Sequence, residues 1–228
     1  MKRSEINQIM LSAEEFLRRH SFYLPPFASW TPQDWAQKGD EVREIVENRL
    51  GWDITDFGLG DFRSRGLFLF TLRNGRPTSD LEAQNKPYCE KIMIVGDGQI
   101  TPYHFHWSKT EDIINRGGGK LLVQVYASTP DETLDQEAPV VLSTDGVQRR
   151  LPAGAILELT PGESVTLPPY CYHQFWGQGT TLVGEVSAVN DDSRDNRFLG
   201  GVGRFPVVDE DEAPLHLLVS DYPRYYSS

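Results

Sequence analysis

The stretch that decides the fold is residues 98–119, GQITPYHFHWSKTEDIINRGGG. His104 and His106 lie in a segment of alternating character, so on a β-strand both side chains leave the same face, about 6–7 Å apart. Glu111 follows five residues after His106, which is far enough for the chain to turn and return a carboxylate from the next strand. His173 supplies a third imidazole from a distant strand. We predict that these four side chains bind one metal ion.

The types of these ligands indicate a catalytic metal site. Three neutral imidazole nitrogens and one carboxylate suit a divalent first-row metal, and six-coordination would leave two neighbouring positions open for substrate. An accidental His-x-His pair is the alternative, but three of the five histidines in the chain fall into this one pattern. Ligand types alone do not separate Mn²⁺ from Zn²⁺, Co²⁺ or Fe²⁺.

The spacing of this stretch resembles the first signature motif of the cupin superfamily. The matching positions are Gly98, His104, His106, Glu111 and Gly118. The second cupin motif has its counterpart in Gly162, Pro168 and His173. Two positions depart from the family pattern: Tyr170 stands where cupins usually have glycine, and Gly177 where they usually have asparagine. The resemblance implies an antiparallel β-barrel.

Composition excludes several classes of protein. The chain has 228 residues, 39% of them hydrophobic, which is enough for a sizeable core. A net charge of −11 without a basic patch argues against nucleic acid and against an anionic membrane surface as partners. Two cysteines are too few for a disulfide framework, and the N-terminus lacks the apolar core of a signal peptide. We therefore expect a cytoplasmic protein.

Hydrophobic periodicity divides the chain into a helical part and a β part. Helical spacing over 4–19 and 39–50, with a cap and a proline at Thr31-Pro32, predicts an N-terminal helical extension over 1–51. Residues 52–62 are expected to form a glycine-rich loop. Strands are predicted at 66–73 and 90–95, and many further short strands follow at eight- to twelve-residue spacing. We expect one domain, 1–228, with a barrel over 52–228 whose tail from 190 on wraps back across it.

Longer blocks of the sequence resemble the D-lyxose isomerase family over nearly the whole chain. These blocks are FYLPPFASWTP, GWDITDFGLGDF, LFLFTLRNG, EKIMIVGDGQITPYHFHWSKTEDIINRGGG, LTPGESVTLPPYCYHQFWG, LVGEVSAVNDDSRDNRFL and VGRFP. The resemblance implies interconversion of D-lyxose with D-xylulose, and often of D-mannose with D-fructose. It also implies a cupin barrel, a divalent metal that is commonly manganese, and a homodimer.

Aldose–ketose isomerisation moves a proton between C1 and C2 through a cis-enediol, which requires a base and a group that stabilises charge on O1 and O2. We expect Glu185 to be the base, because a carboxylate in the apolar stretch LVGEVSAV needs a partner or a raised pKa. Lys109, between two ligands, could place an ammonium near the same oxygens or exchange their proton. An edge glutamate in water and a solvated loop lysine are the alternatives.

Three further residues are candidates for binding the sugar. Lys91 begins an apolar strand and could point into the barrel, and Asp195 and Arg197 could hold the distal hydroxyls. A surface salt bridge is the alternative explanation for the last two.

Two other functions fit the same ligand set. A cupin dioxygenase would use iron on these four residues, but its redox chemistry has no need of Lys109 or Glu185. A non-catalytic sugar-binding or sensing barrel is the second rival. A sensor would be expected to have a pair of DNA-binding helices with a basic face, but the predicted helices over 4–19 and 39–50 are not basic.

Overall fold

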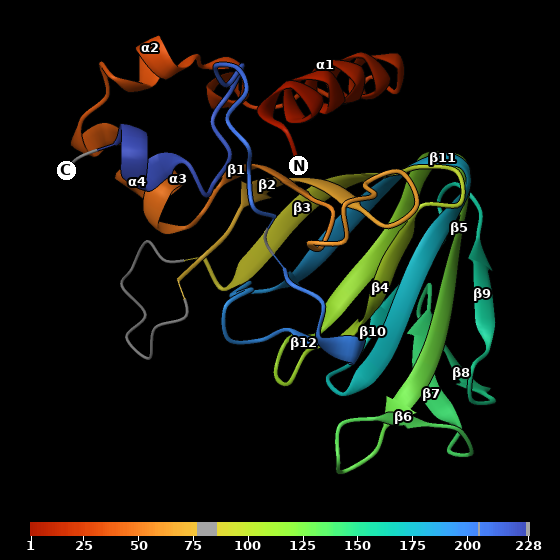
Figure 1. The fold of residues 1–228 in the computed structure, drawn as a ribbon. Coiled ribbons are helices and arrows are strands. Elements are labelled where there is room, and N and C mark those ends of the chain that lie inside the picture. The colour runs from red at the N-terminus through yellow and green to blue at the C-terminus, as the bar shows by residue number, and fades with distance from the viewer. Residues whose placement is uncertain (77–85, 205, 227–228) are drawn as a thin grey trace.

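The computed structural model describes residues 1–76, 86–204 and 206–226. Figure 1 shows a helical layer on one side of a large, strongly curved antiparallel sheet. The helical layer consists of α1 (Arg3–Arg19), η1 (Pro26–Ser29), α2 (Pro32–Trp35), η2 (Asp40–Val42) and α3 (Arg43–Glu47). Thr31 caps α2 as predicted, through a reciprocal hydrogen-bond pair with Asp34.

Two boundaries in this region differ from the prediction. The helix expected over 39–50 is reduced to η2 and α3, because Arg49 has a φ of 53° and the chain then enters a strand at Gly51. The loop expected over 52–62 begins with that strand, β1 (Gly51–Thr55), which pairs along its length with β2 (Leu67–Arg73). Its side chains explain the strand, since Trp52 and Ile54 alternate with Asp53 and pack under the helices.

The remaining elements are almost all strands. They are β3 (Tyr88–Val95), β4 (Ile100–Phe105), β5 (Glu111–Ser128), β6 (Leu134–Asp135), β7 (Val140–Thr144), β8 (Val147–Leu151), β9 (Ile156–Leu159), β10 (Ser164–Leu167), β11 (Cys171–Ala188), β12 (Arg197–Phe198), η3 (Leu199–Gly201) and α4 (Tyr222–Tyr225). β2 and β3 confirm the two strands predicted at 66–73 and 90–95.

Two long strands form the frame of the barrel. β5 and β11 have 18 residues each and pair with each other from end to end. The first half of β11 also pairs with β4, and its second half pairs with β3. The same strand therefore connects β4 with the β1–β3 part of the sheet. The main strand order is β1-β2-β3-β11-β5-β10-β7-β8. This jelly-roll-like arrangement, which does not close completely, confirms the predicted mainly β, cupin-type fold.

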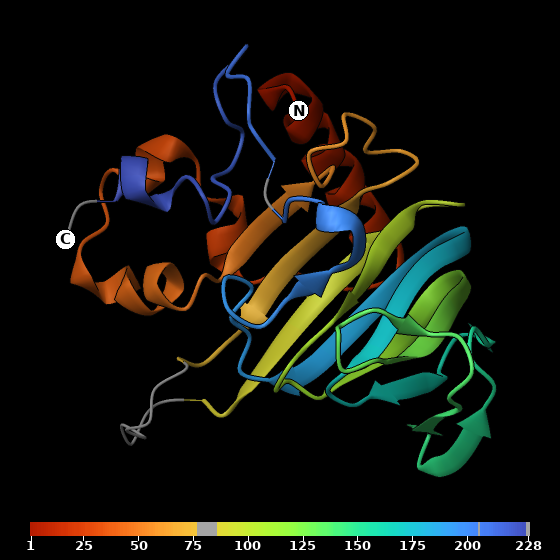
Figure 2. The same ribbon diagram turned by 60° about the horizontal axis from the view of Figure 1, so that its bottom comes forward.

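Alternation along the strands creates two apolar layers. Inward-facing residues such as Leu69, Met93 and Val183 form the core of the barrel, together with residues from the other strands. Outward-facing residues such as Phe70 and Ile92 pack against α1, which covers that side of β1–β3 (Figures 1 and 2).

The C-terminal tail packs against the helical extension. α4 lies beside α3 (Figure 1), and its Tyr222 packs against Trp35 of α2. Arg3, with 1% of its surface exposed, donates hydrogen bonds to the carboxylates of Asp221 and Glu210 in the tail. The beginning of α1 is therefore held by residues from the other end of the sequence.

None of the helices in the described part of the chain is both long and apolar enough to cross a membrane.

Candidate metal centre and adjoining cavity

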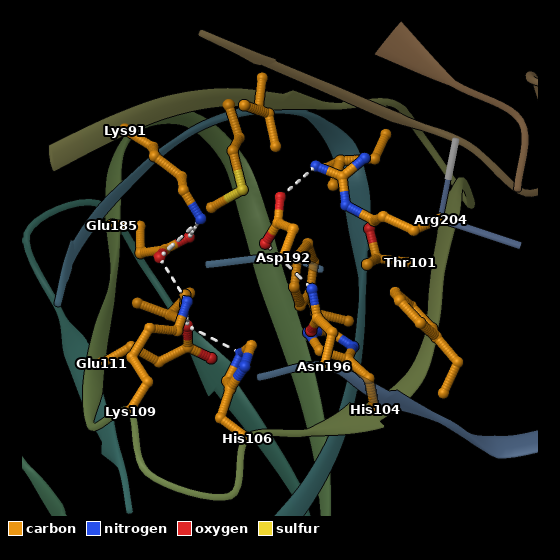
Figure 3. A pocket seen from close by; sticks show the side chains of 16 residues that line it. Lys91, Thr101, His104, His106, Lys109, Glu111, Glu185, Asp192, Asn196 and Arg204 are labelled. Atoms are coloured by element: carbon orange, nitrogen blue, oxygen red, sulfur yellow. Dashed lines mark hydrogen bonds and ion pairs between the residues drawn. The ribbon is translucent and has the colours of Figure 1, made fainter. Parts of the chain in front are cut away.

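The four side chains predicted as metal ligands lie together inside the barrel. One ligand atom from each of His104, His106, Glu111 and His173 lies within 4.8 Å of the others, and all four residues are buried. Figure 3 shows three of them at one side of the cavity. The two histidines of the HFH segment come from the end of β4 and the residue after it, and Glu111 is the first residue of β5.

The curvature of β11 brings these residues together. His173 pairs with His104 on β4, so their imidazoles are neighbours across two strands, with ring centroids 4.1 Å apart. Along the β5–β11 ladder, in contrast, Glu111 pairs with Ser187 and His173 with Val125. The Glu111 and His173 side chains nevertheless approach to 3.0 Å, because the long strands curl around the interior.

All three imidazoles present the same nitrogen to the centre. The Nδ1 atoms of His104 and His173 lie 2.8 and 3.0 Å from the backbone carbonyls of Pro102 and Cys171, and His106 Nδ1 contacts the carbonyl of Asp195. A proton on Nδ1 satisfies each carbonyl and leaves Nε2 as a lone pair for a ligand. His106 Nε2, His173 Nε2 and Glu111 Oε1 are buried and form no hydrogen bond among the described residues, although Glu111 Oε1 lies 3.0 Å from His173 Nε2, because with the proton on Nδ1 both of these atoms are acceptors. These orphaned atoms fit a divalent cation.

The electrostatics of the group also suit a cation. Burial, followed by the neighbouring His173 and His106, holds the pKa of His104 well below its usual range, so this imidazole is neutral. Burial would raise the pKa of Glu111, but Lys109 and His106 hold it well below its ordinary value. The neutral imidazole of His104 and the ionised carboxylate of Glu111 are in the protonation states that metal binding requires.

A buried charged cluster adjoins the ligands and consists of Lys91, Lys109 and Glu185. Lys109 Nζ lies 2.9 Å from Glu185 Oε1 and 2.8 Å from Glu111 Oε2. Lys91 Nζ lies 3.1 Å from Glu185 Oε1, because the two residues are directly paired between β3 and β11. Asn190 accepts a hydrogen bond from each lysine, at 2.8 and 3.2 Å. All three charged residues of the cluster line the cavity (Figure 3).

The sequence allowed Glu185 either a partner or a raised pKa, and the structure gives it partners. Burial would raise the pKa of Glu185, but the ammonium groups of Lys109 and Lys91 lower it below its ordinary value. Conversely, burial would lower the pKa of Lys109, whereas Glu111 and Glu185 raise it. Glu185 is 5% exposed and is not an edge residue in water. A lowered pKa provides an ionised carboxylate at neutral pH, which is the form that accepts a proton.

Asp195 and Arg197 occupy positions other than the expected ones. The Asp195 carboxylate accepts the backbone N–H groups of residues 107, 108 and 109, at 2.7 to 3.0 Å, and so holds the loop between two ligands. Arg197 Nε donates to Glu132 at 2.8 Å, and its side chain is 39% exposed. Neither residue lines the cavity. Asp195 is occupied by backbone groups, and Arg197 forms the surface salt bridge that was the alternative explanation.

The wall of the cavity that faces the charged cluster is formed by residues that the sequence analysis did not identify. They are Thr101, Asp192, Asn196 and Arg204 (Figure 3). Asp192 lies between Arg204 and Asn196, with hydrogen bonds of 2.8 and 3.0 Å. The segment 190–204 has no strand or helix periodicity, and the only available signal was its density of Asp, Asn and Arg directly after the apolar stretch LVGEVSAV.

Solved structures share this fold. L-ribose isomerase from Cellulomonas parahominis superposes with a TM-score of 0.59 at 18% identity, covering 92% of this chain and 98% of that chain. L-ribose isomerase from Acinetobacter sp. DL28, solved in complex with L-ribose, gives a TM-score of 0.59 at 16% identity, with the same coverage. The fold and the buried group of three histidines and one glutamate define a cupin-type barrel with an interior site suited to a divalent metal.

Sequence comparisons identify the family. The D-lyxose isomerase family model matches residues 1–222. The D-lyxose/D-mannose isomerase of Escherichia coli O157:H7 is 47% identical over 99% of this chain and 100% of its own length. The enzyme of that name from Serratia proteamaculans is also 47% identical, over 99% of each chain. The chain belongs to the D-lyxose isomerase family and is a sugar isomerase.

Proposed function

We propose that this protein interconverts D-lyxose with D-xylulose and D-mannose with D-fructose. The observation that carries this proposal is the junction of two groups in one cavity: four converging metal-binding side chains and the charged cluster of Lys91, Lys109 and Glu185. The 47% identity to two D-lyxose/D-mannose isomerases supports the choice of these sugars.

His104, His106, Glu111 and His173 would hold the metal ion, for which we propose Mn²⁺, with Zn²⁺, Co²⁺ and Fe²⁺ as alternatives. When bound, a divalent ion would act as a Lewis acid that stabilises negative charge on the sugar oxygens. The Nδ1 contacts to backbone carbonyls fix the imidazole orientations before the ion arrives.

Glu185 and Lys109 would carry the protons. In the direction from aldose to ketose, the Glu185 carboxylate takes the proton from C2 while the Lys109 ammonium donates a proton to O1, which gives the cis-enediol. Lys109 then takes the proton from O2, and the Glu185 carboxyl group returns its proton to C1. Both side chains end as they began. Their mutual contact of 2.9 Å is consistent with this shared role.

Lys91 would keep Glu185 ionised and orient it. Its ammonium lies 3.1 and 3.3 Å from the two carboxylate oxygens, so both oxygens of the base have a fixed direction. Lys91 would also donate a hydrogen bond to a sugar oxygen, which is the role that the sequence suggested.

The charged cluster distinguishes this proposal from its rivals. An iron dioxygenase would use the same four ligands with oxygen, and a sugar-binding barrel would need no proton-transfer groups. Burying three charged side chains costs free energy even when they are paired, and proton transfer beside a metal is a function that accounts for their presence in the cavity. The family resemblance further leads us to propose a homodimer and a cytoplasmic location.

The direct test removes the metal by chelation, restores Mn²⁺, and follows D-lyxose and D-mannose in deuterated water by proton NMR. We expect ketose to form only after metal is restored, with deuterium at the transferred position to the extent that the base exchanges with solvent. Iron-loaded protein assayed for oxygen consumption is the control for the rival chemistry. Failure of both sugars to react would reject the sugar assignment and leave the metal site in place.

A further inference from the structure

The wall of the cavity opposite the charged cluster contains two buried polar atoms that have no partner among the described residues. They are Thr101 Oγ1, on β4, and Asn196 Oδ1, in the segment before β12. Thr101 is 2% exposed, and both residues line the cavity that contains the metal-binding side chains (Figure 3). An unsatisfied buried polar atom costs free energy. Two of them on one wall point to a ligand that brings its own hydrogen-bonding groups.

A hydrogen bond to Asp192, which is itself held by an ion pair, fixes the orientation of Asn196. Its Nδ2 donates to Asp192 Oδ1 at 3.0 Å, and Asp192 Oδ2 accepts from Arg204 Nη2 at 2.8 Å. Arg204 is in turn held by Asp53 on β1, at 2.7 Å. Because the amide nitrogen is occupied, the unpartnered atom is the amide oxygen, which is an acceptor. This wall therefore presents one oriented acceptor, Asn196 Oδ1, and one hydroxyl, Thr101 Oγ1.

We propose that Thr101 and Asn196 form a subsite for the sugar hydroxyls beyond C2. This inference rests on the proposed function, which places C1 and C2 beside the metal-binding group, Lys109 and Glu185. The hydroxyls further along the sugar must then be paired elsewhere in the cavity. One of them donates to Asn196 Oδ1, and another exchanges a hydrogen bond with Thr101 Oγ1.

The subsite gives the cavity a means of selecting among aldoses. All aldoses share the carbonyl and hydroxyl chemistry at C1 and C2, so the metal-binding end cannot distinguish their distal groups. A sugar that lacks a distal hydroxyl, or presents it in the opposite configuration, leaves a buried polar atom unpaired. Sites built to hydrogen-bond a hydroxyl discriminate strongly against analogues without it. Thr101 and Asn196 are thus specificity-determining residues.

The test compares three threonine variants of the manganese-loaded protein. Thr101→Val removes the hydroxyl and keeps the shape, and Thr101→Ser restores a hydroxyl. Thr144→Val is the matched control, because Thr144 Oγ1 is also buried without a partner among the described residues but lies on β7, outside the cavity lining. We expect kcat/KM for D-lyxose to fall roughly 10- to 100-fold in Thr101→Val, with Mn²⁺ affinity unchanged. Thr101→Ser and Thr144→Val should stay close to the parent protein.

A second arm separates failure of the subsite from failure of the proposed function. Calorimetry measures the binding of xylitol, a polyol that cannot isomerise, to the same manganese-loaded proteins. If the parent protein isomerises the sugars and Thr101→Val has unchanged kcat/KM, the subsite is wrong and the isomerase assignment stands. If the parent isomerises neither sugar, the proposed function is wrong. Xylitol bound more weakly by Thr101→Val alone then supports a polyol subsite, whereas equal binding or none overturns it.

Discussion

The two faces of strands β2, β3 and β11 have different compositions and different tasks. On the outer face, Phe70 and Ile92 are apolar residues packed beneath α1. On the inner face of the same strands, Lys91 and Glu185 lie among apolar residues such as Met93 and line the cavity. Because strand residues alternate in direction, adjacent positions belong to different environments. The outer face therefore contributes mainly to stability, whereas the inner face has charged residues for catalysis at positions where apolar residues would stabilise the fold more.

The largest effect is expected at the metal-binding group. His173→Ala removes an imidazole from a buried group whose other members cannot replace it, so the affinity for Mn²⁺ should collapse and isomerisation should fall to the level of the chelated protein. Metal content after gel filtration and the NMR assay measure both. A variant that retains metal and activity would remove His173 from the site.

The next effect tests the inner face without touching a proposed ligand. Glu185→Gln keeps the shape of the side chain but removes the base, so we expect kcat to fall about 10²- to 10⁴-fold with metal content intact. Single-turnover kinetics on metal-loaded protein, with circular dichroism to verify folding, provides the measurement. Full activity with full metal content would show that another group takes the C2 proton.

The outer face should behave in the opposite way. Ile92 is adjacent to Lys91 but packs beneath α1, and it is 2% exposed. Ile92→Ala should lower the free energy of unfolding by about 2–5 kcal/mol, through lost burial and the cavity left behind. Its kcat per folded molecule should not change. Urea unfolding measures the free energy of unfolding, and an active-site titration gives kcat per folded molecule. A lower kcat in Ile92→Ala without a change in stability would show that the two faces do not have separate roles.

A smaller effect is expected in the loop that connects the two metal-binding residues His106 and Glu111. Asp195→Asn replaces one of the carboxylate oxygens that accept the N–H groups of residues 107–109, so the loop loses part of its anchor. Residues that orient metal ligands typically contribute about 10- to 100-fold in metal affinity or activity. Asp191→Asn, in the same segment but bonded to Ser193, is the control. Equal effects of both variants would mean that the segment acts only through its general stability.

The smallest effect concerns acid stability. Burial would raise the pKa of Asp192, but Arg204, Lys91 and Lys109 hold it far below its ordinary value of 3.8. A carboxyl group with a lowered pKa stabilises the fold above its ordinary value, and this contribution is lost as pH falls toward the folded-state pKa. In chelated protein, the stability difference between the parent and Asp192→Asn should therefore stay constant above about pH 5 and shrink progressively as the pH falls below it. Parallel pH curves would contradict this.

The features that the sequence predicted are the ones encoded locally. The spacing around His104 follows from one turn between two strands, and His173 joined it through a second motif with its own spacing. The alternation of β2 and β3 is equally local. The family resemblance supplied the jelly-roll-like architecture, because periodicity alone gives strands but not their order.

The features that were missed depend on contacts between distant segments. Lys91 and Glu185 are 94 residues apart and meet only through the β3–β11 register, so neither the partner of Glu185 nor the direction of its pKa shift could be read from the sequence. Asp192 and Arg204 lie in an irregular segment, where no periodicity indicates which side chains turn inward. Asp195 was predicted to bind sugar hydroxyls, whereas in the structure it accepts backbone N–H groups of the loop 107–109. The sequence does not distinguish these two roles of an aspartate.

The contact between Arg3 and Asp221 has a consequence for how the protein is made. These residues are 218 positions apart, and their ionic contact is buried. During synthesis on the ribosome α1 emerges before the tail, so the guanidinium of Arg3 cannot reach the carboxylates of Asp221 and Glu210 until the tail has been translated. The barrel strands can pair in the meantime, while the helical layer cannot reach its final packing. The Arg3–Asp221 contact can therefore form only after residue 221 has been synthesised, and a ribosome that stalls before residue 221 should leave a chain whose α1 is readily cleaved by protease.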